Sequence, residues 1–263
     1  MFAKLFRQSQ NARKSASPRV PDGVRVYCVG DIHGRADLLK ALHRGIQADA
    51  AQSPPARNIV VYVGDYVDRG MHSREVIDHL LGDPLPGFEK VYLKGNHDDS
   101  LLQFLRDPDL GPTWFSYGGD ATVLSYGVRM TPGKSGRERF EDMRQQLQAN
   151  LPPSHLEFLQ TLRLTFECGD YLFVHAGLRP GVGLEQQTAE DMMWIREDFL
   201  DSRHDFGKVV VHGHSVTETP EMRDNRIGID TGAYASDTLT CLILEGDGRH
   251  FIGTEKARRQ QGA

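Results

Sequence analysis

The sequence predicts an α/β fold in which a second β-sheet packs on the first. In the first half of the chain, three short β-forming runs are each followed by glycine and then by a segment with helical periodicity, as is typical of α/β units. In the second half, β-rich runs follow one another closely with turns between them, which favours a further sheet.

The three α/β units begin at Val24 and end before Pro108, which interrupts the third helix. The first strand is expected at Val24–Val29, and the helix behind it carries Leu38, Leu39, Leu42 and Ile46 at helical spacing. The other strands and helices of this half are expected at Ile59–Val63, Val76–Leu81, Lys90–Leu93 and Asp98–Leu105.

Residues 111–153 are expected to form a helical insertion or lid. They are aromatic and glycine-rich at first, and then charged and glutamine-rich, with helical character in Arg137–Leu151. After them the chain returns to β-rich runs, and strands are expected at Leu164–Glu167, Tyr171–Val174, Val209–Val211, Arg226–Ile229 and Leu239–Leu244.

We therefore expect one catalytic domain over residues 23–255. Residues 1–22 are expected to be a disordered tail, because residues 1–21 hold five basic and no acidic residues and no continuous apolar stretch. The alternative is that the amphipathic start MFAKLF attaches to a membrane surface or a partner. Residues 256–263 are polar and are expected to be frayed.

Composition excludes several classes of function. A net charge of −5 argues against binding to long nucleic acids, which requires an excess of basic residues. The three cysteines are far apart with no CxxC spacing, so neither a disulfide framework nor a zinc knuckle is expected. No apolar run reaches the roughly 18 residues of a membrane span, and we expect a cytoplasmic protein without a transmembrane segment.

Polar side chains follow each of the first three strands. Asp31 and His33 follow the first, Asp65 follows the second, and Asn96 and His97 follow the third. A single turn of this kind is equally well explained by an aspartate that caps the next helix. Three such turns, however, face one crevice at the carboxyl ends of the strands, and their side chains are ligands that suit a divalent transition metal with bound phosphate.

Two further histidine segments follow apolar runs in the second half. His175 follows the run that ends at Val174, and His212 and His214 follow the run that ends at Val211. These imidazoles are expected to complete the coordination shell.

The segments GDIHG, GDYVDRG, GNHD, HAG and HGHS occur in this order, and together they resemble the calcineurin-like metallophosphoesterases. They are most similar to the bacterial and phage-type serine/threonine protein phosphatase branch. The resemblance covers roughly residues 24–245. It implies two mixed β-sheets packed as a central sandwich flanked by helices, and it implies two bound divalent metal ions.

The resemblance also implies a role for each matching residue. Asp31 and His33 would hold one metal, Asp65 would bridge, and the second metal would be held by Asn96, His175 and His214. His97 would be the general acid and Asp68 would orient it, while the phosphate would be bound by Arg69, Arg196 and Asn96. His212 is expected outside the ligand set, and Asp98 is expected to be a helix N-terminal carboxylate.

The function expected from this resemblance is hydrolysis of phosphomonoesters by a metal-activated hydroxide. The substrate would be a phosphorylated protein, with phosphoserine and phosphothreonine as the first expectation, or a small phosphoester. Hydrolysis of diadenosine tetraphosphate and a preference for phosphotyrosine are alternatives, the latter because Trp114–Tyr117 could line an aromatic pocket. A non-catalytic phosphopeptide-binding module predicts missing ligands, and none is missing. Manganese is the expected metal, with iron or zinc as alternatives.

Overall fold

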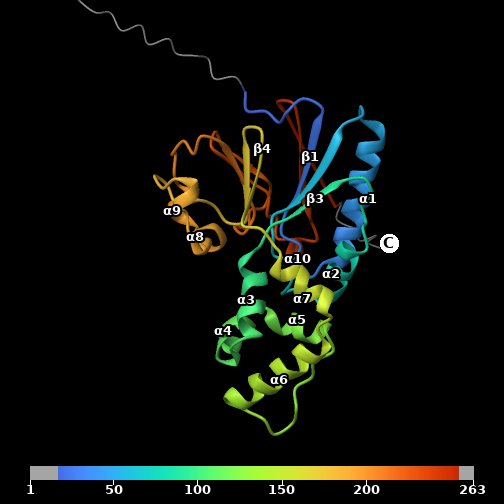
Figure 1. Ribbon diagram of the computed structural model, residues 1–263, viewed down its shortest axis with the longest axis vertical. Helices are drawn as coiled ribbons and strands as arrows, with labels where there is room; N and C mark the ends of the chain where they lie inside the picture. Colours follow the sequence, from blue (N-terminus) through green and yellow to red (C-terminus); the bar gives the residue numbers. More distant parts are fainter. Residues whose placement is uncertain (1–16, 255–263) are drawn as a thin grey trace, which may run out of the picture.

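The computed structural model describes residues 17–254 and contains two five-stranded β-sheets that face each other (Figure 1). The first sheet has the strand order β10-β9-β1-β2-β3 and the second has the order β4-β5-β6-β8-β7. Each sheet contains both parallel and antiparallel pairs. The predicted α/β sandwich of two mixed sheets is therefore confirmed.

The first sheet is built around three parallel strands, β1 (Val24–Val29), β2 (Arg57–Tyr62) and β3 (Glu89–Tyr92). Strands β9 (Thr240–Glu245) and β10 (Gly248–Gly253) extend it on the other side in antiparallel pairing. The helices that follow β1 and β2 bury apolar residues against its outer face, and they are α1 (Ala36–Gln52) and α2 (Ser73–Leu81).

The second sheet has a parallel centre and antiparallel edges. Its strands are β4 (Thr165–Cys168), β5 (Tyr171–Val174), β6 (Val209–His212), β7 (Glu221–Met222) and β8 (Arg226–Gly228). Its outer face packs on a small apolar cluster that includes residues of α8 (Ala189–Trp194) and α9 (Glu197–Leu200). The short element η2 (Leu184–Gln186) lies in the connection from β5 to β6, and α10 (Ala233–Ser236) lies where the chain returns from β8 to β9 of the first sheet.

The space between the sheets is filled by side chains that alternate along the strands. Val26 and Cys28 of β1 and Val61 of β2 meet Phe173 of β5 and Val211 of β6 in one buried cluster. Because successive side chains of a strand point to opposite faces, the intervening residues of β1 and β2 pack on the helices instead. The two faces of the first sheet thus bury two separate cores, which makes it the rigid centre of the fold.

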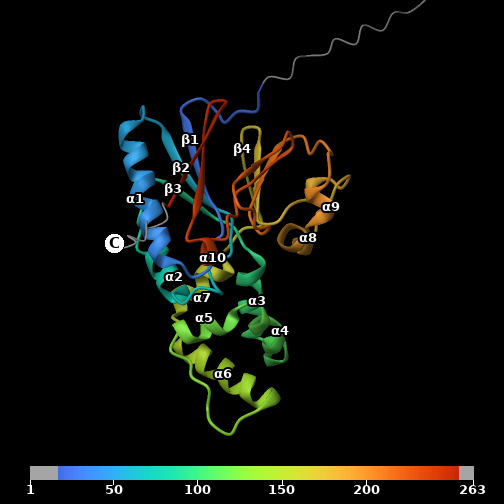
Figure 2. The ribbon, with the colours of Figure 1, turned by 180° about the vertical axis from the view of Figure 1, so that it is seen from behind.

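A helical region projects from one end of the sandwich (Figures 1 and 2). Residues 111–153 contain most of it. Its elements are α3 (Asn96–Phe104), η1 (Pro108–Leu110), α4 (Gly111–Ser116), α5 (Gly119–Ser125), α6 (Gly136–Asn150) and α7 (Pro153–Gln160). Trp114, Phe140 and Leu147 from this region join the same core as α1 and α2, so the insertion is packed onto the domain.

Two parts of the structure differ from the sequence-based prediction. Strands β7 and β10 were not expected. β7 has two residues and forms by pairing with β8, and β10 lacks a run of β-branched residues and forms by pairing along β9. The tail predicted for residues 1–22 is wrong for residues 17–22: Val20 is fully buried and its N–H donates to the carbonyl oxygen of Gly246. The predictions for residues 1–16 and 256–263 lie outside the described residues.

Replacing Phe173 by alanine tests the packing of the two sheets. Phe173 is fully buried between them, so Phe173→Ala is expected to lower the free energy of unfolding by about 3–5 kcal/mol. Leu81→Ala removes a side chain that is 46% exposed, and we expect it to cost about 1 kcal/mol or less. Urea denaturation measures the free energy of unfolding of both variants. If Phe173→Ala lost as little stability as Leu81→Ala, the packing of Phe173 between the sheets would be contradicted.

Candidate dinuclear metal centre

The predicted ligands come together at one edge of the sandwich, because each follows the carboxyl end of a strand. Asp31 and His33 follow β1, Asp65 follows β2, and Asn96 begins α3 shortly after β3. His175 follows β5 and His214 follows β6 in the other sheet. All six side chains are buried. Both sheets therefore contribute to one site.

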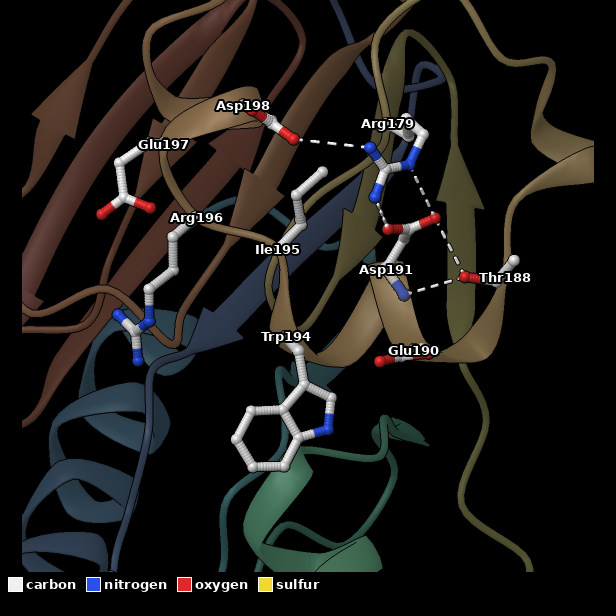
Figure 3. Close-up of a pocket in the computed structure, with 9 residues that line it drawn as sticks. All are labelled: Arg179, Thr188, Glu190, Asp191, Trp194, Ile195, Arg196, Glu197 and Asp198. Atoms are coloured by element: carbon white, nitrogen blue, oxygen red, sulfur yellow. Dashed lines mark hydrogen bonds and ion pairs between the residues drawn. The ribbon is translucent and has the colours of Figure 1, made fainter.

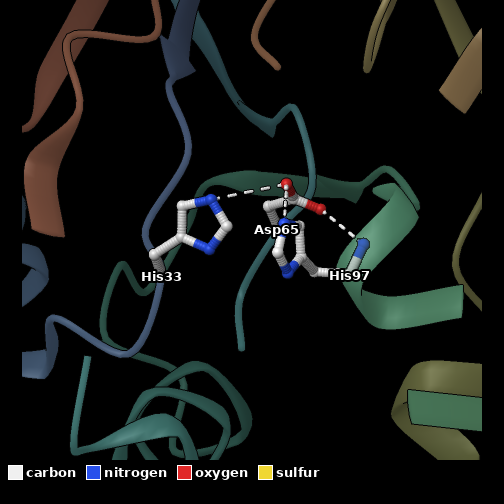
Figure 4. A group of neighbouring side chains, drawn as sticks. All are labelled: His33, Asp65 and His97. Atoms are coloured by element: carbon white, nitrogen blue, oxygen red, sulfur yellow. Dashed lines mark hydrogen bonds and ion pairs between the residues drawn. The ribbon is translucent and has the colours of Figure 1, made fainter. Parts of the chain in front are cut away.

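Asp65 lies at the centre of the site. Its Oδ2 atom is 3.5 Å from His33 Nε2 and 3.4 Å from His175 Nε2, so one carboxylate oxygen faces an imidazole from each sheet. Its Oδ1 atom accepts a hydrogen bond from the backbone N–H of His97 at 3.0 Å. Figure 4 shows this carboxylate between His33 and His97.

Two groups of potential metal ligands share this carboxylate. His33, Asp65 and His97 form one group, and Asp65, His175 and His214 form the other. The amide oxygen of Asn96 lies 2.9 Å from His175 Nε2 and 2.9 Å from His214 Nδ1, and so joins the second group. Asp65 belongs to both groups and could therefore contact a metal ion in each.

Asp31 borders the first group. Its Oδ2 accepts from the backbone N–H of His214 at 3.0 Å, whereas its Oδ1 is buried with no partner among the described residues. Burial and the nearby carboxylates of Asp230 and Asp65 raise the pKa of Asp31 well above its usual value. A buried carboxylate in this environment is stabilised in its charged form by a cation.

The protonation of the histidines fits a pair of metal ions. The Nδ1–H groups of His33 and His175 donate to the carbonyl oxygens of Val67 and Val63, so their Nε2 lone pairs point at Asp65. Burial lowers the pKa of His33 to about 3 and that of His214 to about 2, and it also lowers the pKa of His175. Neutral imidazoles facing a carboxylate oxygen without an intervening proton are arranged as metal ligands.

His97 and Asp68 form a buried pair beside this centre. His97 Nδ1 donates to Asp68 Oδ2 at 2.7 Å, and His97 Nε2 points toward Asp65, 4.0 Å from its Oδ2. Burial lowers the pKa of His97, but the carboxylates of Asp65 and Asp68 outweigh it and raise the pKa above its ordinary value. Because Nδ1 donates to Asp68, Nε2 is the nitrogen that can take up and give up a proton at the site.

Asp68 is itself fixed by the helical region. Trp114 Nε1 donates to its Oδ2 at 2.8 Å, and Thr122 Oγ1 donates to its Oδ1 at 2.6 Å. The hydroxyls of Ser73 and Thr122 also accept from the Asp68 backbone N–H. The sequence suggested Trp114 only as part of an aromatic stretch that could line a pocket, and it did not suggest Thr122. Their contact with Asp68 was missed because they lie 46 and 54 positions away and belong to no motif.

Arg69 lies at the mouth of the site. Its Nη2 donates to His97 Nε2 at 3.2 Å, and its guanidinium carbon is 4.5 Å from the centre of the Tyr234 ring. Its side chain is only partly buried. The guanidinium can therefore reach a phosphate placed between the metals and His97.

Arg196 lies just before α9, in the connection between β5 and β6. It lines a pocket of about 500 Å³ beside the centre, and its Nη1 donates to Ser215 Oγ at 3.5 Å. In Figure 3 the side chain points away from Arg179, which is engaged with Asp191 and Asp198. Since Ser215 follows His214 directly, Arg196 lies near the second ligand group, as a phosphate-binding residue requires.

His212 lies outside both ligand groups. Its Nδ1 donates to the carbonyl oxygen of Gly213, its Nε2 accepts from Arg226, and its ring packs edge-on against Phe199. Burial lowers its pKa to about 4, so the ring is neutral. It supports the end of β6 that carries His214.

The site concentrates backbone strain. Among the described residues, seven non-glycine residues have a positive φ, and five of them belong to this site: His33, Asp65, Asp68, Arg69 and His214. Such conformations are costly for residues with a β-carbon and persist where the surrounding structure imposes them. Close approach adds a further constraint, because a β-carbon at Gly95 would lie 1.9 Å from Asp65 Oδ1.

Asp98 links the second and third turns, a role that the sequence did not reveal. Its Oδ2 accepts from the backbone N–H groups of Asp65 and Gly95, both at 2.9 Å, and its Oδ1 accepts from the N–H of Tyr66 at 3.0 Å. It is fully buried. Although Asp98 stands in the first turn of α3, as predicted, its carboxylate does more than favour the helix dipole, because it fixes the backbone that carries Asp65.

Together, the sandwich and a carboxylate shared by two ligand groups define a metal-dependent phosphoesterase. The sequence model of the calcineurin-like phosphoesterases matches residues 24–245. The chain belongs to this family, whose members use a dinuclear divalent metal centre. It is a hydrolase.

Individual relatives have several activities. The chain is 27% identical to the asymmetrical bis(5'-nucleosyl)-tetraphosphatase PrpE of Anoxybacillus flavithermus, over 81% of this chain and 88% of that protein. A serine/threonine phosphatase of Saccharomyces cerevisiae has a similar structure, with a TM-score of 0.54 and 14% identity over 93% of this chain and 86% of that one. The cold-active protein-tyrosine phosphatase of Shewanella has a TM-score of 0.51 and 16% identity, over 89% and 83% of the two chains.

Replacing Asp98 tests whether it positions the bridging carboxylate. Asp98→Ala leaves three buried N–H groups without their acceptor, so we expect the metal-free protein to lose about 2–4 kcal/mol of stability and the metal affinity to fall. Denaturation and metal analysis by mass spectrometry measure the two effects.

The matched control is the neighbouring carboxylate on the same helix. Among residues 17–254 the Asp99 carboxylate pairs only with the side chains of Lys94 and Gln103, so Asp99→Ala is expected to cost about 1 kcal/mol or less and to keep its metal. If both variants are equally stable and equally loaded with metal, Asp98 does not hold the turns.

Proposed function

We propose that this protein is a phosphomonoesterase that removes phosphate from phosphorylated protein side chains, with phosphoserine and phosphothreonine as the first expectation. The observation that carries the proposal is the buried His97–Asp68 pair, with Arg69 in contact with it, beside the shared carboxylate of Asp65. This arrangement supports the proposal, because His97 as proton donor and Arg69 as phosphate ligand would act together beside the metal ligands. We further propose that manganese is the resident metal and that the protein is cytoplasmic.

Asp31, His33, Asp65, Asn96, His175 and His214 would hold the metal ions. Divalent ions held there would supply Lewis-acid activation of the phosphate and of the attacking water. The shared Asp65 fixes the relative position of the two groups of ligands. Its own backbone is fixed by Asp98.

His97 would donate its Nε2 proton to the leaving oxygen. Asp68 keeps the ring in the required orientation and stabilises its charged form. In the structure Arg69 donates to the same nitrogen. A nitrogen that accepts this hydrogen bond carries no proton. A substrate phosphate would compete for the Arg69 guanidinium, so binding of the ester would position the phosphate and free His97 Nε2 to take up a proton from solvent before passing it to the leaving oxygen.

Arg196 would bind the phosphate from the opposite side. It lies between α8 and α9, in the connection from β5 to β6 of the second sheet, whereas Arg69 lies in the turn after β2 of the first. Two guanidinium groups and the amide of Asn96 can offset the charge that is spread over the phosphate oxygens in the transition state.

A second candidate is hydrolysis of dinucleoside tetraphosphates. The name of the Anoxybacillus relative favours it. However, exposed carboxylates of Glu190 and Glu197 line the pocket beside Arg196. A polyphosphate chain entering that pocket would meet like charge, whereas a peptide would not.

Measured turnover distinguishes the two candidates. The manganese-loaded protein is assayed on phosphoserine, phosphothreonine and phosphotyrosine peptides and on diadenosine tetraphosphate. We expect the best peptide to have the highest kcat/KM. A nucleotide that is cleaved far faster than every peptide would contradict the proposal.

Replacing His97 tests its role as proton donor. His97→Asn is expected to bind metal normally and to lose about 10²–10⁴-fold in kcat for alkyl esters, with a much smaller loss for 4-nitrophenyl phosphate, whose leaving group needs no proton. Kinetics on both esters, with metal analysis, provide the measurement. The same loss on both esters would show that His97 does not protonate the leaving group.

A further inference from the structure

Asp230 is a buried carboxylate at the metal centre that the predicted ligand set does not include. It lies two positions after the end of β8, and β8 runs parallel to β6. The carboxyl end of β8 therefore opens at the same edge of the second sheet as the ends of β5 and β6, which carry His175 and His214. Asp230 is thus a further polar residue that follows a parallel strand at this edge.

The backbone brings Asp230 next to Asp31. Gly30 and Ile229 directly precede these two residues. A β-carbon at Gly30 would lie 2.5 Å from the carbonyl oxygen of Ile229, so the two segments pass each other in close contact. The carbonyl oxygen of Asp230 also accepts from the N–H of Thr217 at 3.0 Å, which fixes it to the loop after β6. The carboxyl groups of Asp31 and Asp230 lie within reach of a hydrogen bond to each other.

One oxygen of each carboxylate has no partner among residues 17–254. Asp230 Oδ1 accepts from the backbone N–H of Gly232 at 2.9 Å, whereas its Oδ2 is buried and unpaired. Asp31 shows the same division, since its Oδ2 accepts from the N–H of His214 and its Oδ1 is unpaired. Only 2% of Asp31 and 1% of Asp230 is exposed. Buried acceptor oxygens in this position require a cation or a proton to satisfy them.

The balance of charge leads to the same requirement. Asp31, Asp65 and Asp230 are all buried, and within the described part of the chain none of them forms an ion pair with a lysine or an arginine. The second ligand group has a single carboxylate, that of Asp65, beside two imidazoles and an amide. The excess of buried negative charge therefore lies on the side of Asp31 and Asp230.

We propose that Asp230 supplies a third carboxylate to the first metal site, beside Asp31 and Asp65, and that its free Oδ2 helps to hold a divalent ion there. The ion would be one that prefers oxygen ligands, such as Mn²⁺, because three carboxylates and the single imidazole of His33 would surround it. The inference rests on the metal centre of the proposed function, but not on the choice of substrate.

Replacing Asp230 by asparagine separates a role toward the metal from a role in the turn. The amide oxygen of Asp230→Asn can still accept from the Gly232 N–H, and its NH₂ group can donate to the unpaired Oδ1 of Asp31. We therefore expect the metal-free variant to be at least as stable as wild type in urea denaturation with EDTA. Because one negative charge is lost, one of the two manganese ions should bind roughly 10- to 100-fold more weakly, as measured by titration with Mn²⁺ followed by electron paramagnetic resonance.

Two further variants calibrate the titration. Asp237→Asn is the matched control, because Asp237 follows α10 in the same connection and its exposed carboxylate pairs with Arg35. This variant should bind both ions as wild type does. Asp31→Asn removes a carboxylate of the same site, and it should weaken the same ion as Asp230→Asn.

Anomalous diffraction locates the ion that is affected. Crystals of Asp230→Asn grown with limiting manganese should keep the peak beside His175 and His214 and lose the peak beside Asp31 and His33. In manganese-loaded wild type, Asp230 Oδ2 should contact the first ion or a water molecule bound to it. This second measurement tests the inference even if the variant does not fold.

Two results would overturn the inference. If Asp230→Asn bound both manganese ions as tightly as wild type, a proton rather than an ion would satisfy the pair of carboxylates. A wild-type structure in which Asp230 Oδ2 contacts neither the first ion nor its bound water would also contradict the inference.

The two proposals fail in different ways. If diadenosine tetraphosphate is cleaved far faster than every peptide while Asp230→Asn loses the first ion, the proposed substrate is wrong and the role of Asp230 stands. If the peptides are the best substrates but Asp230→Asn keeps both ions, the proposed function stands and the role of Asp230 is wrong.

Discussion

The structure depends above all on the placement of one buried carboxylate, that of Asp65. One of its oxygens faces imidazoles from both sheets, and the other is held by the backbone of His97. A buried negative charge is stable only when cations or donors surround it. Here the imidazoles of His33 and His175 are neutral, and their Nε2 lone pairs point at Asp65. These side chains therefore require bound metal ions to balance the charge of the carboxylate. The packing of the two sheets keeps those imidazoles at the required separation.

The His97–Asp68 pair depends on a different part of the chain. Asp68 is fully buried and receives hydrogen bonds from Trp114 and Thr122 of the helical region. The same region supplies Tyr117 at the mouth of the site. Residues 111–153 therefore do more than cover the sandwich: they hold the partner of His97 and shape the side on which the leaving group would depart. A change in this insertion could alter selectivity while leaving the metal ligands intact.

Much of the fold and of the site could be predicted from the sequence, for a physical reason. The ligands stand directly after strands, and the carboxyl ends of parallel strands meet at one edge of a sheet. A polar residue that follows a predicted strand can therefore be placed at that edge from the sequence alone. The roles of Asp98, Trp114 and Thr122 could not be predicted in this way. Asp98 binds backbone groups 32 and 33 residues away, and Trp114 and Thr122 reach Asp68 only once the helices have packed. Strand β10 escaped prediction because pairing along β9, rather than its own composition, creates it.

The central claim is that Asp65 serves two metal ions at once. Anomalous X-ray diffraction from crystals of the manganese-loaded protein tests it most directly. The account predicts two manganese peaks roughly 3.5–4 Å apart, one beside Asp31 and His33 and the other beside Asn96, His175 and His214, with Asp65 in contact with both. A single peak, or two peaks of which only one contacts Asp65, would contradict it.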